Sequence, residues 1–386
     1  MAISTTTMVE SALALVPALR ERRLETDEDR RIPDATIADI DALGILGTTV
    51  PVELGGEDLG VDGLFDVCYA LGTGCAATSW VAGNYAIHNL LALMFSPEAQ
   101  AEMFIPGERL PRISTGFSPA RASAVPADGG SVITGQWDFT SGVDSSDWVI
   151  VNVMSEQGPL AHLIPTAELE IVDTWHTVGL RGTGSKDVAA KDLFVPQHRI
   201  LPLGVTIIAQ TVGRELYPSP FLRLPLTSMF HVALIGSILG AANGALEVFT
   251  EQTSAKYGGL SGIQVGARPE VHHRLGEAAA EINAARLAVR ATFAEMREMG
   301  AVEVEPSVLD RTRWRRDAAW AAKIAVQATD RLYAVGGAHS LFVDDQLAQY
   351  HRDVTAGSHH YGLSYDMLFA AHGQARLGQE PTVPML

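Results

Sequence analysis

The residues best suited to proton transfer are two adjacent histidines near the C-terminal end, His359 and His360. An imidazole that titrates near neutral pH can hold or remove a proton. His360 lies seven residues after Asp353, which follows an arginine; the alternative is a pair of solvated histidines in a polar loop. A third histidine, His88, lies in an apolar helical segment, where a lone histidine is more often a satisfied core residue.

A β-like run around residue 137 carries two aromatic residues and a hydroxyl. Trp137, Phe139 and Ser141 follow one another at every second position. Because side chains alternate along a strand, we expect these three on one face. The alternative for Ser141 is a turn serine that precedes Gly142.

Several kinds of site lack their signatures in this sequence. Only two cysteines occur, Cys68 and Cys75, and no Cys/His cluster has zinc spacing, so we expect no metal site and no disulfide framework. No Gly-x-Gly-x-x-Gly motif opens a helix after a strand, so we expect no dinucleotide fold for NAD(P)H. Phe221 to Ala245 contains no carboxylate, and Val354 to Gln379 contains no glutamate.

Length and charge bound the class of protein. A chain of 386 residues suffices for two or three subdomains around a large core. A net charge of -17 argues against nucleic-acid binding. The N-terminus lacks the basic start of a secretory signal, and the apolar run Val232 to Phe249 includes Asn243 and Glu247, which favours a buried bundle helix over a membrane span. We therefore expect a cytoplasmic enzyme.

Periodicity divides the chain into three regions: helical residues 1–111, short strands over 112–210, and helices over 211–386. Strand-like runs at 131–134, 148–154, 160–164, 170–172 and 188–195 predict a small antiparallel β-barrel. Long helices over 226–250, 277–299 and 314–335 predict a four-helix bundle. The expected fold class is α+β, mainly α, with a helical domain, a central barrel and a C-terminal bundle.

Five segments resemble the acyl-CoA dehydrogenase superfamily. They are Leu43 to Gly56, Gly135 to Gly142, Gly179 to Ser185 with Val195-Pro196, Gly336-Gly337-Ala338, and Arg352-Asp353. A dehydrogenase of this superfamily needs a carboxylate base over the flavin. The family carries that glutamate either shortly after the Arg-Asp pair or in the first bundle helix. Neither place has a glutamate here, and His359 and His360 stand in the place after the Arg-Asp pair.

Within the superfamily, the chain is similar to the oxygenase components of two-component (group D) flavin monooxygenases, such as those acting on p-hydroxyphenylacetate and on secosteroid phenols. The resemblance implies reduced FMN or FAD supplied by diffusion from a separate NAD(P)H-dependent flavin reductase, with O₂ as co-substrate. It also implies hydroxylation of a phenolic or polycyclic aromatic substrate through a flavin hydroperoxide. The bundle turn at Gly336 and Gly337 would meet the flavin tail of a neighbouring subunit, which implies a homotetramer.

The resemblance also assigns roles to individual residues. His360 and His88 would face the substrate hydroxyl, and the hydroxyl or amide of Ser141 would bond the redox-active nitrogen of the flavin. The remaining substrate-pocket positions are Ser114, Thr115 and His359, and the remaining cofactor positions are Trp137, Phe139, Ser118, Gly336, Gly337 and Lys256. Ser254 stands where dehydrogenases carry the arginine that grips the FAD pyrophosphate, and Lys256 is the candidate substitute.

Three alternatives stay open at this point. The chain could be a dehydrogenase or oxidase with a relocated base, which bound oxidised FAD would favour. It could be an N- or S-oxygenating monooxygenase of the same fold. A non-catalytic structural protein is the third alternative, although it would not need the Trp-x-Phe-x-Ser strand.

Overall fold

The computed structural model describes residues 3–118, 121–156, 158–255, 257, 262 and 264–383. Its N-terminal helices are α1 (Thr5–Glu21), α2 (Arg23–Asp29), α3 (Asp34–Leu43), α4 (Gly60–Gly72), α5 (Ala76–Ala92) and α6 (Pro97–Met103). The strands are β1 (Ile113–Gly116), β2 (Ala122–Ala127), β3 (Gly130–Thr140), β4 (Trp148–Ser155), β5 (Gly158–Pro165), β6 (Glu170–Val172), β7 (Lys186–Pro196) and β8 (Ile200–Pro202). The C-terminal helices are α7 (Gly204–Ile207), α8 (Val212–Leu216), α9 (Val232–Ala255), α10 (Pro269–Ala301), α11 (Val308–Tyr333), α12 (Gln346–Ser358) and α13 (Tyr365–Arg376).

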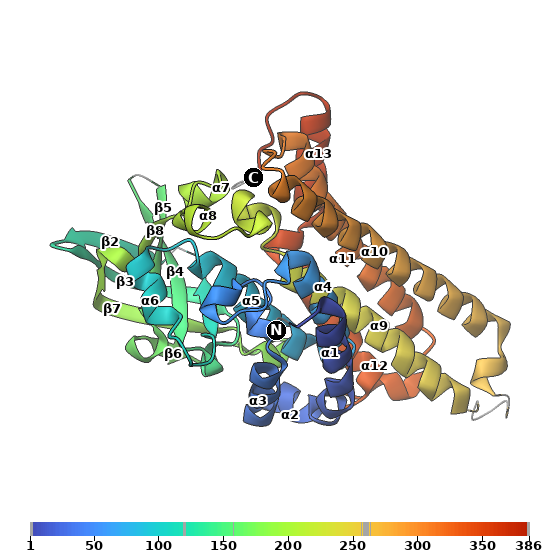
Figure 1. Cartoon of the computed structure of the whole chain (residues 1–386). Helices are drawn as coiled ribbons and strands as arrows, with labels where there is room; N and C mark the ends of the chain where they lie inside the picture. Colours follow the sequence, from blue (N-terminus) through green and yellow to red (C-terminus); the bar gives the residue numbers. More distant parts are fainter. Residues whose placement is uncertain are drawn as a thin grey trace.

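The predicted order of helices, strands and helices is confirmed, and Figure 1 places the strands on one side and the long bundle helices on the other. Local capping explains several helix starts. Ser4 and Ser96 accept hydrogen bonds from backbone amides at the beginning of α1 and α6. Ser307 and Asp310 form a reciprocal capping box at the start of α11. The boundaries 1–111, 112–210 and 211–386 stay a prediction.

The middle region is two sheets instead of the predicted closed barrel. One sheet has the order β1-β4-β5-β8 and the other β2-β3-β7-β6. No ladder between named strands of the described residues joins them, and β1 pairs with β4 in parallel, so the region is not wholly antiparallel. The sheets pack face to face over a valine-rich core centred on Trp137. The barrel prediction was wrong because spacing along the chain cannot distinguish a closed sheet from two packed ones.

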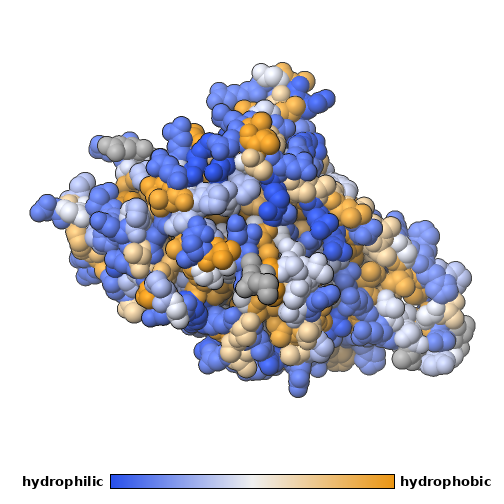
Figure 2. Space-filling view, in the orientation of Figure 1, coloured by the Kyte–Doolittle hydropathy of each residue, from blue (hydrophilic) through white to orange (hydrophobic). Residues whose placement is uncertain are grey.

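The bundle is formed by α9, α10, α11 and α12, as predicted, with α13 packed on α11. The stretch Leu226–Ser254 is long and apolar enough to cross a membrane, but 83% of its most apolar window is buried within the protein. Burial against α4, α5, α10, α11 and α12 accounts for its composition. The face in Figure 2 intersperses hydrophobic residues among many hydrophilic ones, as expected for an acidic protein in water.

Helix α5 connects the two halves of the molecule. It packs on α9 and α12 of the bundle, and on β1 and the short helix η5 (Arg181–Thr183) of the middle region. Gly357 of α12 lets this contact become close, because a Cβ there would lie 3.0 Å from Ile238 and 3.2 Å from the Trp80 ring. The candidate site residues lie around this junction.

Candidate active site

Ser141 lies at the centre of a group of hydroxyls just beyond the end of β3. Its Oγ lies 2.7 Å from the Ser185 Oγ and accepts from the Trp80 Nε1–H at 3.3 Å. Its backbone N–H donates to the Phe139 carbonyl at 3.0 Å, and its carbonyl accepts from the Ser114 hydroxyl at 2.8 Å. Because the amide is already used, the hydroxyl is the group of Ser141 that remains for a cofactor.

The predicted shared face of Trp137, Phe139 and Ser141 is wrong. The Trp137 indole is fully buried between the sheets, where its Nε1–H donates to the Asn152 carbonyl at 2.8 Å. Phe139 is 65% exposed. The ladder between β3 and β7 gains an extra residue between Trp137 and Thr140, and Phe139 has a φ of 62°. This bulge breaks the alternation, so Phe139 faces outward while Trp137 supports the strand from inside.

His360 lies at the beginning of the short helix η11 (Tyr361–Leu363) and meets the Trp80 ring edge-on, with 5.8 Å between ring centroids. Its Nδ1 accepts from the Gly362 N–H at 3.0 Å. The side chain keeps accessible surface, yet the protein packed around it desolvates the ring and lowers its pKa to about 4. The ring is therefore neutral at pH 7, and with Nδ1 occupied as an acceptor its proton is on Nε2. His360 thus presents a hydrogen-bond donor.

His359 lies outside this group of contacts. Its side chain is exposed, and its Nδ1 lies 2.8 Å from the Thr355 carbonyl of its own helix. The Nδ1–H of His359 is directed back to α12. His359 therefore serves as a control position for His360.

His88 presents the opposite polarity. Its Nδ1 lies 2.7 Å from the Ile113 carbonyl, which can only accept, so Nδ1 carries the proton. Nε2 is then an acceptor, and it lies 3.2 Å from the Thr115 Oγ1. Complete burial lowers the pKa of His88 to about 4, so the ring is neutral. Thr115 donates its proton to His88 and keeps free lone pairs for a further donor.

Two aromatic rings pack beside His88. Phe230 stacks on His88 at 5.3 Å between centroids and contacts Phe117 at 5.6 Å. Flat apolar walls of this kind suit an aromatic ligand.

The other predicted positions are spread more widely. Ser114 is buried and bonded to Ser141, and Ser118 is half-buried just beyond β1. Gly336 and Gly337 lie in the turn after α11, where Gly337 has a φ of 80°. Lys256 lies outside the described residues. Within the described chain, the structure brings Ser114, Thr115, Ser141, His88 and His360 into one connected region, with the glycine turn apart from it.

Four residues of this region had no predicted role. Trp80 joins Ser141 to His360, and Thr183 and Ser185 continue the hydroxyl group from Ser141. His231 is buried, its Nε2 has no hydrogen-bond partner among the described residues, and burial lowers its pKa to about 3, with the charges of Arg315 and His360 adding to the shift. Thr183 and Ser185 belong to the Gly179 to Ser185 motif, but only the fold reveals their contacts with Ser141.

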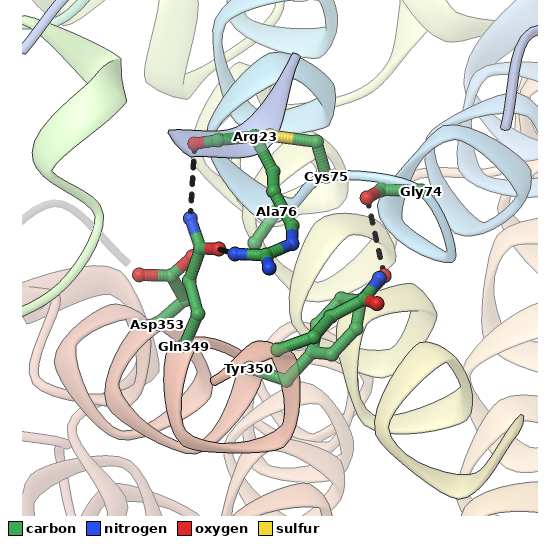
Figure 3. Close-up of a pocket in the computed structure, with 8 residues that line it drawn as sticks. Arg23, Gly74, Cys75, Ala76, Gln349, Tyr350 and Asp353 are labelled. Atoms are coloured by element: carbon green, nitrogen blue, oxygen red, sulfur yellow. Dashed lines mark hydrogen bonds between the residues drawn. The ribbon is translucent and has the colours of Figure 1, made fainter. Parts of the chain in front are cut away.

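Asp353 of the Arg-Asp pair is a buried structural group. Its Oδ1 accepts from the Leu180 N–H at 2.7 Å, and it lines a cavity of about 10 Å³ with Arg23, Gln349 and Tyr350 (Figure 3). Such a volume holds at most about one water molecule. Burial raises the pKa of Asp353 to about 7; Asp27 adds to this rise, while the Leu180 amide and Arg352 oppose it.

The raised pKa of Asp353 predicts a pH-dependent stability. An unfolded aspartate ionises near pH 3.9, so the folded state loses stability relative to the unfolded state as pH rises from about 4 to 7. Asp353→Asn does not ionise and can still accept from Leu180. We expect its melting temperature, relative to wild type, to rise across that window when both proteins are melted from pH 4 to 8. Parallel curves would contradict the assignment.

The residues present fit a flavin. Ser141 offers a half-buried hydroxyl, and Phe139 offers an outward ring that meets Trp175 edge-on at 6.0 Å between centroids. A non-glycine residue with positive φ is strained, and such strain is often retained at ligand sites. The geometry thus places polar and aromatic groups together beside two histidines of opposite polarity.

Comparison with known proteins decides the family. Residues 10–108 match the acyl-CoA dehydrogenase N-terminal domain, and residues 233–365 match the C-terminal domain. The oxygenase subunit HsaA of a flavin-dependent monooxygenase from Mycobacterium tuberculosis is 30% identical, over 95% of this chain and 94% of its own. The chain belongs to the flavin-dependent monooxygenases of the acyl-CoA dehydrogenase family.

Other members of this monooxygenase family agree over the whole chain. A pigment production hydroxylase from a Rhodococcus species is 29% identical, over 100% of both chains. The crystal structure of 3-HSA hydroxylase from Rhodococcus superposes with a TM-score of 0.91 at 27% identity, covering 100% of this chain and 99% of that one. XiaF from a Streptomyces species, solved with FADH2 and glycerol, has a TM-score of 0.89 at 27% identity, covering 99% and 98%. The fold prediction is thereby confirmed, apart from the closed barrel.

Proposed function

We propose that this monooxygenase is the oxygenase component of a two-component system that hydroxylates a phenolic ring with reduced flavin and O₂. The observation that carries the proposal is the pair of neutral histidines with opposite polarity, His360 as a donor and His88 as an acceptor through Thr115. A phenol hydroxyl needs both, because it donates one hydrogen bond and accepts others. The aromatic wall of Phe230 and Phe117 supports a flat substrate.

His360 holds the phenolic oxygen. Its Nε2–H donates to that oxygen, and the donation becomes stronger as the phenolic proton leaves, because the carbonyl-like oxygen that forms is a better acceptor than a phenol oxygen. A fixed donor whose hydrogen bond strengthens along the reaction stabilises the transition state more than the ground state. The contacts with Trp80 and Gly362 fix the ring for this purpose.

Thr115 and His88 accept the phenolic proton. At rest, an imidazole with a pKa of about 4 is too weak a base to ionise a phenol. As a ring carbon forms its bond to the incoming oxygen atom, however, the ring loses electron density and the phenolic O–H becomes far more acidic. A weak base then suffices to remove the phenolic proton. The proton passes from the phenol to Thr115 Oγ1 while Thr115 passes its own to His88 Nε2, so the threonine ends unchanged.

The flavin, when bound, activates O₂ for transfer to the ring. Ser141 and Phe139 would hold it, and the buried hydroxyls around Ser141 would keep bulk water away. Relatives support the redox state: one is named an FADH(2)-dependent resorcinol hydroxylase, oxygenase component, and XiaF was solved with FADH2.

The proposal that a separate reductase supplies the reduced flavin can be tested by measuring NAD(P)H consumption and phenol hydroxylation with and without an added flavin reductase. We expect no NAD(P)H oxidation by the purified protein alone, and hydroxylated product only when reductase, flavin and O₂ are all present. Hydroxylation driven by NAD(P)H without any reductase would contradict the two-component assignment.

We also propose a cytoplasmic homotetramer. Three consecutive apolar side chains, Leu341, Phe342 and Val343, follow the glycine turn and are 76%, 61% and 80% exposed in the single chain. Such a patch suits contact between copies.

Phe342→Asp tests this assembly. It should shift the mass measured by light scattering toward smaller species, because a buried charge would be unpaired in the interface. The matched control is Val125→Asp, at an exposed apolar position on β2. An unchanged tetramer in Phe342→Asp, or a wild-type monomer, would contradict the proposal.

A further inference from the structure

A row of hydroxyl groups runs from the backbone of Leu180 to Ser141. The Thr183 Oγ1 lies 2.8 Å from the Leu180 carbonyl oxygen, and 2.7 Å from the Ser185 Oγ. The Ser185 Oγ in turn lies 2.7 Å from the Ser141 Oγ. Thr183 and Ser185 are buried and Ser141 is half-buried.

The first member of the row fixes the direction of every proton in it. A carbonyl oxygen carries no proton, so Thr183 must donate to Leu180. Its single proton is then used, and Ser185 must donate to Thr183. The proton of Ser185 is used in the same way, and Ser141 must donate to Ser185.

Ser141 is therefore left as an acceptor. Its proton points to Ser185, and one of its lone pairs receives the Trp80 Nε1–H at 3.3 Å. A hydroxyl has one proton and two lone pairs, so a single lone pair remains for a ligand. A ligand atom at this position must donate a hydrogen bond.

The start of the row is anchored to the bundle. Leu180 has a φ of 50°, an unfavourable conformation for a leucine, and Asp353 of α12 holds its N–H at 2.7 Å. Close contact reinforces the anchor, because a Cβ on Gly179 would lie 2.3 Å from the Arg352 carbonyl oxygen. The Leu180 carbonyl is thus held as a fixed acceptor, and the row cannot reverse by turning it away.

We propose that Thr183 and Ser185 determine which redox state of the flavin binds, by making Ser141 an obligate acceptor. The inference rests on the proposed contact between Ser141 and the redox-active nitrogen of the flavin. In reduced flavin that nitrogen carries an N–H and can donate to Ser141. In oxidised flavin it has only a lone pair, which would face the lone pair of Ser141 across a partly desolvated contact.

The test compares dissociation constants for oxidised and reduced FMN, measured anaerobically by ultrafiltration, and repeated with FAD. We expect wild type to favour reduced flavin. In Thr183→Val, the Ser185 proton is released and can turn to Ser141, whose own proton can then face the flavin. The preference for reduced flavin should fall about tenfold, the usual value of correcting one buried hydrogen-bond mismatch. Thr183→Ser keeps the hydroxyl and should keep the preference.

Three further variants make the outcome decisive. Thr329→Val makes the same change at an equally buried threonine that bonds within α11, and it should leave the preference unchanged. Ser185→Ala breaks the row at another point and should lower the preference as Thr183→Val does; it also serves if Thr183→Val fails to fold. An unchanged preference in either folded variant overturns the inference. Ser141→Ala tests the contact with flavin separately from the role of Thr183 and Ser185. If Ser141→Ala alters the dissociation constant of neither oxidised nor reduced flavin, the proposed contact between Ser141 and flavin is itself wrong.

Discussion

Replacing His360 with alanine is expected to lower the rate of hydroxylation about 10²- to 10³-fold, the usual cost of removing one fixed donor whose hydrogen bond to the reacting oxygen is strongest in the transition state. The loss should fall on oxygen transfer, so reduced flavin should still be consumed and most of the O₂ should appear as H₂O₂. The measurement counts product and H₂O₂ per flavin oxidised. His359→Ala is the matched control, because its ring is bonded to the Thr355 carbonyl of its own helix. Equal effects of the two variants would contradict the assignment.

His360→Asn distinguishes a donor from a base at this position. An asparagine side chain can still donate an N–H but has no basic nitrogen. If the Nε2–H of His360 acts as a donor, His360→Asn should retain clearly more coupled hydroxylation than His360→Ala. If His360→Asn instead loses as much coupled hydroxylation as His360→Ala at every pH from 6 to 9, His360 acts as a base and its assigned tautomer is wrong.

Thr115→Val is expected to slow hydroxylation about 10²-fold or more, because it interrupts proton passage to His88 without changing side-chain size much. Thr115→Ser should restore most of the rate. Since Thr115 and His88 act in one path, adding His88→Leu to Thr115→Val should cost much less than the product of the two single effects. The measured quantities are single-turnover rates of product formation.

Thr140→Val provides the matched control for Thr115→Val. Thr140 is a fully buried threonine at the end of β3, and its Oγ1 has no hydrogen-bond partner among the described residues. The same change there should leave the rate near wild type and raise the melting temperature slightly. Independent, multiplicative losses in Thr115→Val and His88→Leu would contradict a shared proton path.

Much of the architecture follows from periodicity alone. The apolar stripe of α11 and the small-residue surface of α9 can only be buried against other helices, so the bundle was predictable. The two sheets were harder to predict, because β1 and β8 are short and their partners β4 and β5 lie far along the chain. Their arrangement depends on which edges pair, and local pattern carries little of that information.

The site could be predicted in part. His360 and Ser141 were singled out through motifs, but their hydrogen-bond polarity depends on the local turn at Gly362 and on Ser185 and Trp80, which only the fold brings near Ser141. The bulge after Trp137 placed Phe139 on the opposite face from Trp137, since one extra residue in a strand shifts the alternation. His88 looked like a core histidine and is indeed buried, yet its free nitrogen faces Thr115.

Transfer of one oxygen atom from O₂ to a phenolic ring, driven by reduced flavin, is the reaction proposed for this protein. The most direct test is a single turnover without NAD(P)H, in which chemically reduced flavin, the protein and a phenol are mixed with isotopically heavy O₂. The product is then examined by mass spectrometry. We expect one heavy oxygen atom in each molecule of hydroxylated product, with wild type forming far more product per flavin than His360→Ala. Product oxygen derived from water, or oxidation of the substrate without any oxygen gained, would contradict it and favour a dehydrogenase or oxidase.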